Sequence, residues 1–159
     1  MNYQEWTTTV PAEITQDPLW SLEVYRLALF VADIGWEDVV LLDKNKITRD
    51  AADQIHRSLD SISANIAEGY SRSTGKDRAR YFEYSLGEAR EARDRYFKAR
   101  RGLKEDVVLH RIKLLTQIVK ILTAFVPIQR KRGIREGKGI YITFSEFENE
   151  ILHAPIPMS

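Results

Sequence analysis

A run of basic side chains between residues 72 and 104 is the part of the sequence best suited to chemistry with a ligand. It holds eleven basic and five acidic residues, whereas residues 1–43 hold eight acidic residues and one basic residue. The net charge of +1 over 159 residues therefore hides a strong separation of charge. Five cations in this run could present one phosphate-binding surface on a predicted helix: Arg90, Arg93, Arg100, Arg101 and Lys104.

The same run has a second interpretation as a solvated helix face. Glu91 and Arg95 stand four residues apart, as do Asp94 and Lys98, and this is the spacing of stabilising ion pairs on a helix. Other cations could pair with the acidic first helix of the same subunit or of a neighbouring one. Three aromatic residues could stack on unpaired bases, although packing within the protein is the favoured interpretation: Tyr81, Tyr84 and Tyr96.

No residue pattern predicts an enzyme, a metal site or a cofactor. The chain has no cysteine, which excludes thiolate nucleophiles and thiolate metal sites. Asp53–His56 and Glu150–His153 have the acid-to-histidine spacing of carboxylate-bridged di-iron bundles, but the first histidine lies off the apolar stripe and the second lies in the tail. We expect no acid inside the core to complete such a site. We expect His110 to be a solvated or ion-paired residue.

The sequence also predicts a cytoplasmic protein without a membrane span. There is no window of about 18 uncharged apolar residues of the kind that crosses a bilayer. Residues 1–5 lack the basic start and apolar stretch of a signal peptide. The absence of cysteine fits a reducing compartment.

Apolar residues at spacings of three and four predict four long helices that would position these side chains. The expected ranges are about 19–43, 49–72, 76–101 and 105–126. Asp17-Pro18 is a helix-start signal, Trp36 belongs to the apolar stripe of the first helix, and Pro127 ends the last helix. Connections of a few residues make successive helices antiparallel neighbours. The prediction is an all-α, antiparallel up-down-up-down four-helix bundle.

The bundle is expected to span residues 17–127, with an arm at each end. Residues 1–16 show no sustained period and are predicted to be a flexible N-terminal arm. Residues 128–159 are predicted to be a basic linker followed by an irregular C-terminal arm, with a short helix near Ser145 to Leu152.

Two segments of the sequence resemble a known family. The string Ser61-Ile62-Ser63-Ala64-Asn65-Ile66-Ala67-Glu68-Gly69 is similar to the Ser-Ile-Pro-Ala-Asn-Ile-Ala-Glu-Gly hallmark of the four-helix-bundle family encoded by intervening sequences in bacterial large-subunit rRNA genes. Leu86-Gly87-Glu88-Ala89-Arg90-Glu91 resembles the third helix of that family. The resemblance covers about residues 18–127, and Ser63 stands where many members have proline.

The resemblance implies a cyclic homo-oligomer, a pentamer in the family, and a basic surface repeated around the ring. A distant likeness to the accessory protein of diversity-generating retroelements implies RNA, DNA, a reverse transcriptase or another acidic protein as a partner. Five residues are expected to serve helix packing or oligomer contacts, with Glu68 structural rather than catalytic: Ser61, Asn65, Glu68, Gly69 and Gly87. The predicted function is a non-catalytic nucleic-acid adaptor. The alternatives are a purely structural protein-interaction ring or an accessory partner of a reverse transcriptase.

Overall fold

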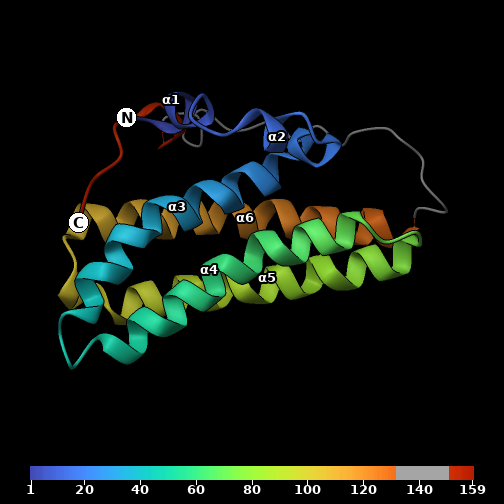
Figure 1. Ribbon diagram of the computed structural model, residues 1–159. Helices are drawn as coiled ribbons and strands as arrows, with labels where there is room; N and C mark the ends of the chain where they lie inside the picture. Colours follow the sequence, from blue (N-terminus) through green and yellow to red (C-terminus); the bar gives the residue numbers. More distant parts are fainter. Residues whose placement is uncertain (132–150) are drawn as a thin grey trace.

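The computed structural model describes residues 1–131 and 151–159. Its long elements are four helices: α3 (Glu23–Asp43), α4 (Arg49–Tyr70), α5 (Gly75–Lys98) and α6 (Glu105–Lys131). They lie side by side in a helical bundle, with α3 packed against α4 and α6, and α5 packed against α4 and α6 (Figure 1). The predicted all-α fold with four long helices is confirmed.

At the start of α5 and at the turn before α3, a side-chain oxygen accepts from a free backbone amide. The Thr74 side chain accepts from the amide of Asp77 at 3.1 Å and caps α5. Asp17 caps in the same way, accepting from the amide of Leu19 at 2.7 Å. The predicted start signal at Asp17 therefore works, but it opens the short 3₁₀ turn η1 (Pro18–Ser21), and α3 begins only at Glu23.

Most side chains of the predicted apolar stripes of the second, third and fourth helices are buried in the core. The α3 stripe is rotated from its predicted position, because its buried face carries Leu27, Ala28, Val31 and Ile34 while Trp36 is 56% exposed. Gly35 also lies on this buried face. A Cβ there would lie 2.5 Å from Leu59, so α4 approaches α3 along this line of the helix.

The last helix continues through Pro127, which corrects the predicted end of the bundle at that residue. A proline inside a helix removes one backbone hydrogen bond. Tertiary contacts hold the following turn against α5: Gln129 Oε1 accepts from Arg78 Nε at 3.3 Å, and Arg130 pairs with Glu83. The helix reaches Lys131 because these contacts outweigh the local signal.

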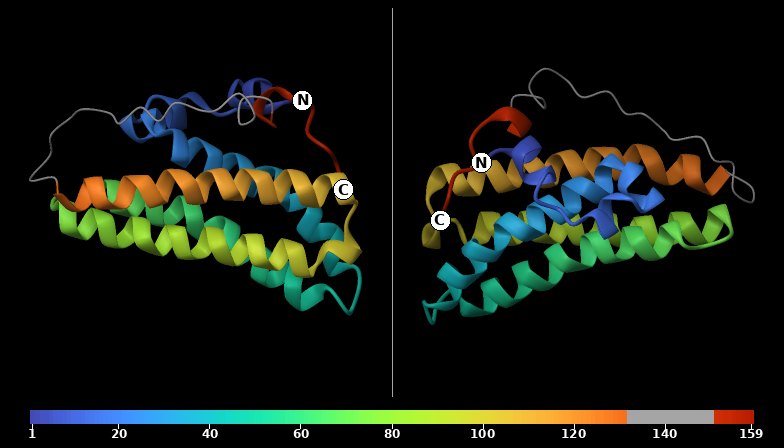
Figure 2. Two further views of the ribbon diagram at one scale, coloured as in Figure 1. Left: turned by 180° about the vertical axis from the view of Figure 1, so that it is seen from behind. Right: turned by 45° about the horizontal axis from the view of Figure 1, so that its top comes forward.

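The N-terminal segment also differs from its prediction, because residues 1–16 are not a loose arm. They form α1 (Tyr3–Thr7) and α2 (Ala12–Thr15), which lie over the start of α3 (Figure 2). Tyr3 and Trp6 are buried against Phe30, with ring centroids 5.1 Å from it in each case. Periodicity missed this segment because two large aromatic side chains anchor it.

Residues 151–159 return to the bundle and lie beside the N-terminus (Figure 2). The amide of Ile156 donates to the carbonyl oxygen of Met1 at 3.0 Å, and Leu152 and Ile156 are buried. The expected basic linker and most of the expected C-terminal arm, including Ser145 to Glu150, fall outside the described residues.

α6 is the one described helix that is long and apolar enough to cross a membrane. Half of the apolar window that meets this test is buried inside the bundle. A core helix passes the same test, so length and composition here are weak grounds for a membrane span.

Candidate nucleic-acid interface and a buried polar cluster

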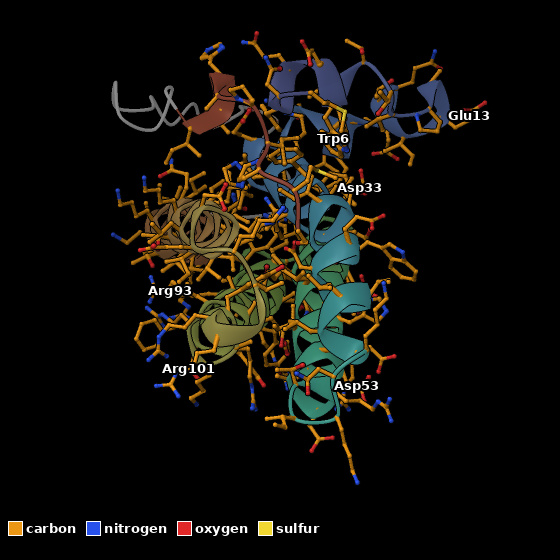
Figure 3. All side chains as sticks on the ribbon, turned by 90° about the vertical axis from the view of Figure 1, so that its left-hand side faces the viewer. Trp6, Glu13, Asp33, Asp53, Arg93 and Arg101 are labelled. Atoms are coloured by element: carbon orange, nitrogen blue, oxygen red, sulfur yellow. The ribbon has the colours of Figure 1, made fainter. Side chains whose placement is uncertain are left out.

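The five predicted phosphate-binding cations do not share one helix, because they lie on α5, in the short turn after it and, for Lys104, in the connection before α6. Arg90 and Arg93 lie on α5, but that helix ends at Lys98. Arg100 and Arg101 lie in the 3₁₀ turn η2 (Arg100–Gly102). The prediction that these cations share one helix is therefore wrong. Arg93 and Arg101 nevertheless project from the same side of the bundle (Figure 3).

None of these five cations forms an ion pair with a carboxylate in the described part of the chain. Arg93 Nη1 donates to Thr116 Oγ1 on α6 at 3.3 Å, and Arg100 Nη1 donates to the carbonyl oxygen of Phe97 at 2.9 Å. Lys104 Nζ donates to a backbone carbonyl of the returning C-terminal segment at 3.0 Å. Lys104 therefore faces that segment, while the arginines keep donors for an external anion.

The predicted intrahelical ion pairs are confirmed. They neutralise two cations of α5, Arg95 and Lys98. Glu91 pairs with Arg95 at 3.2 Å, and Asp94 pairs with Lys98 at 2.6 Å. The excess charge of this face therefore comes from the arginines that the sequence singled out.

Phe97 is the aromatic residue of this surface, and the sequence prediction missed it. Its ring is 56% exposed, and the Arg100 guanidinium carbon lies 4.3 Å from the ring centroid. The predicted Tyr96 is fully buried, and Tyr81 accepts from Arg72 at 2.6 Å. The position of Phe97, seven residues after Arg90, would have placed it on the arginine side of the helix. We name this surface the basic face and define it by its five residues: Arg90, Arg93, Phe97, Arg100 and Arg101.

The family-like string on α4 makes contacts within its own helix and with the start of α5. Asn65 Nδ2 donates to the carbonyl oxygen of Ser61 at 2.8 Å. Glu68 pairs with Arg72, whose guanidinium carbon lies 4.5 Å from the centre of the Tyr81 ring. In this arrangement Glu68 helps to hold the α4–α5 connection.

The two predicted packing glycines have different surroundings. A Cβ at Gly69 would lie 2.9 Å from Tyr81 Cβ and 3.3 Å from the carbonyl oxygen of Arg78, so the close approach of α4 and α5 needs a glycine there. A Cβ at Gly87 would meet no atom within 4 Å. Within one chain, no close approach of another helix therefore requires a glycine at position 87.

Replacing each glycine with alanine is expected to have opposite effects. Gly69→Ala should destabilise the protein by about 1–3 kcal/mol, because backbone and packed side chains must move. Gly87→Ala should stabilise it by up to about 1 kcal/mol, because alanine favours a helix and the space is open. Urea unfolding of both variants measures the difference. A loss of stability or of assembly in Gly87→Ala would show that another subunit occupies the space beside it.

A second group of polar residues lies inside the bundle, where no acid was expected. Asp38 on α3, Tyr96 on α5 and Arg111 on α6 are each 0% exposed. Asp38 Oδ2 accepts from Arg111 Nε at 2.8 Å and from the Tyr96 hydroxyl at 2.9 Å. Burial, followed by the charge of Asp38, raises the pKa of Tyr96 well above its usual value. We name these three residues the polar cluster.

His110 borders the polar cluster and is not the solvated residue that was expected. It is 8% exposed, and its Nδ1 accepts from Arg111 Nη1 at 2.8 Å. Burial, with the neighbouring charge of Arg111, lowers the pKa of His110 to about 4. The imidazole is therefore neutral at pH 7. Its Nε2 is buried without a hydrogen-bond partner.

The described residues contain no group of three or more histidine and acidic side chains that could hold a metal ion. His56 lies 3.5 Å from Asp60 rather than beside further acids, and Asp53 is exposed on α4. His153 is exposed next to Gln4, and Glu150 falls outside the described residues. The polar cluster holds one carboxylate, which Arg111 already neutralises.

Comparisons with known proteins identify the family. Searches of curated proteins and of solved structures found no significant match. The model of the 23S rRNA-intervening sequence protein family matches residues 21–124, which include α3, α4, α5 and most of α6. Because this match covers well over half of the chain, the protein belongs to the 23S rRNA-intervening sequence protein family.

Proposed function

We propose that this protein is a non-catalytic, oligomeric adaptor that binds the backbone of RNA or DNA through its basic face. The observation that carries the proposal is that Arg90 and Arg101 are exposed without an ion pair among the described residues, beside Arg93 and Arg100. Phosphate oxygens are suitable partners because guanidinium groups bind them through paired hydrogen bonds. The exposed ring of Phe97 favours single strands, since unpaired bases can stack on it.

A ring of identical subunits would repeat the basic face around one axis. We propose a homo-oligomer, with five subunits as in the family resemblance. Each face then needs few phosphate contacts, because a strand that spans several subunits gains avidity. We further propose a cytoplasmic location without membrane contact, and the retroelement likeness remains a prediction.

Charge reversal of the basic face tests the proposal. Arg90→Glu, Arg93→Glu and Arg101→Glu together should lower the affinity for a single-stranded RNA at least tenfold, because attraction to phosphates becomes repulsion. The affinity of the unchanged protein should also fall steeply as salt increases. Fluorescence anisotropy measures both effects.

A control variant separates the basic face from net charge. Lys44, Lys46 and Arg57 are exposed outside this face, and replacing all three with glutamate changes the net charge equally. This variant should keep most of the affinity. Equal loss in both variants, or salt-independent binding, would contradict a phosphate-binding face.

A structural ring without nucleic-acid binding is the second candidate, and the exposed face of α3 favours it. Trp36 and Val40 are 56% and 39% exposed there, near the acidic Asp33 and Glu37. This apolar and acidic surface is complementary to the basic face of another subunit. If the triple arginine change dissociates the oligomer in sedimentation experiments, this second function replaces the first. In either case, an acidic protein such as a reverse transcriptase is a further candidate partner that would bind the basic face.

A further inference from the structure

The last described residues contact the polar cluster as a bound peptide contacts a receptor. The carbonyl oxygen of Pro157 accepts from Arg111 Nη2 at 3.1 Å. The Ser159 hydroxyl donates to Asp38 Oδ1. Both Asp38 and Arg111 are 0% exposed, and the two atoms that the segment contacts also bond each other, with Arg111 Nη2 donating to Asp38 Oδ1 at 3.3 Å. The segment therefore adds hydrogen bonds to a buried ion pair.

Recognition of this segment uses mainly its backbone, one hydroxyl and two apolar anchors, Leu152 and Ile156. Lys104 Nζ donates to the carbonyl oxygen of Met158 at 3.0 Å, while the Met158 side chain is 56% exposed. Ile156 is 8% exposed and packs in the core. The ligand is thus a peptide that begins with a helical turn and carries two buried aliphatic residues, the second followed three positions later by a hydroxyl.

Residues 132–150 join α6 to this segment, and their number exceeds what is needed to reach the polar cluster of the same molecule. Ile151 lies with Ile112 and Thr116 around a shared hollow, so the segment rejoins α6 near its middle. About 22 Å of helix separate Thr116 from Lys131. Residues 132–150 could span about 60 Å if extended. The same segment can therefore reach a site on a neighbouring molecule.

We propose that the polar cluster is a peptide-binding site whose ligand is residues 151–159 of a second copy of this chain, so that copies are joined by exchange of this segment. The same contacts form whether the segment comes from its own chain or from another. Exchange therefore loses no contact, which is the physical basis of domain swapping. The proposal is independent of the basic face and of nucleic acid.

A fluorescent peptide with the sequence of residues 151–159 tests whether the site accepts the segment from outside. The receptor is the full chain carrying Ile156→Asp and Ser159→Ala, which weaken the resident segment. The peptide should bind this variant at least tenfold more tightly than it binds the unchanged chain, where the resident segment competes. Circular dichroism checks that the variant is folded.

Changes in the peptide keep the test independent of receptor folding. A peptide with Ser159→Ala should bind at least tenfold more weakly, because a hydrogen bond to a buried carboxylate is lost. A peptide with Met158→Ala should bind equally, because that side chain is exposed. Absence of binding to the folded variant, or equal binding of the Ser159→Ala and unchanged peptides, would overturn the proposal.

Discussion

Replacing Asp38 with alanine is expected to lower the free energy of unfolding by about 3–5 kcal/mol. The change would leave the Arg111 guanidinium fully buried without its carboxylate, and the Tyr96 hydroxyl would lose its acceptor. Desolvation of an unpaired charge is the main cost, since Asp38 and Arg111 are each 0% exposed. Urea unfolding followed by circular dichroism measures the loss.

Glu37→Ala is the matched control, because Glu37 neighbours Asp38 on α3 but is exposed. It should change stability by no more than about 0.5 kcal/mol. The double variant Asp38→Leu with Arg111→Met should lose less stability than either single change, because no buried charge is then left alone. Losses in the double variant equal to the sum of the two single losses would show that the pair is not coupled.

The long helices could be predicted because their signals are local. Ile62 and Ile66 on α4 stand four residues apart, and Phe82 and Ala89 on α5 stand seven apart, which is one and two helical turns, and all four are buried. Helix termini were less predictable. Pro127 is a strong local stop signal, yet contacts between α6 and α5 continue the helix beyond it. Such contacts depend on residues far apart in the sequence.

The sites were only partly predictable for the same reason. Acidic and basic residues can be counted in the sequence, so the arginines of the basic face were found. Asp38 looks like another surface acid until Arg111 on α6, 73 residues later, is placed beside it. Its position four residues after Ile34 and four before Leu42 was the available signal, because both of those residues are buried. Charge alone made this position seem unsuited to the core.

Stability is expected to fall by about 3 kcal/mol as the pH decreases from 7 to about 4, through His110 alone. The pKa of His110 is lowered from 6.5 to about 4 by burial and by Arg111. Between these two values the unfolded chain binds a proton that the folded chain does not, so stability is complete above pH 6.5 and decreases toward pH 4. Protonation at Nδ1 would also remove the acceptor that Arg111 Nη1 uses.

The difference between the unchanged protein and His110→Gln isolates this effect from the carboxylates that titrate in the same range. Glutamine does not titrate, and its side-chain oxygen can accept from Arg111. The variant should therefore have a flatter dependence of unfolding free energy on pH between 4 and 6.5, measured by urea unfolding at several pH values. His56→Gln is the control, because the His56 side chain is 42% exposed. Parallel curves for the unchanged protein and His110→Gln would show that this imidazole is protonated as readily inside the bundle as in water, and the proposed neutral His110 beside Arg111 would be wrong.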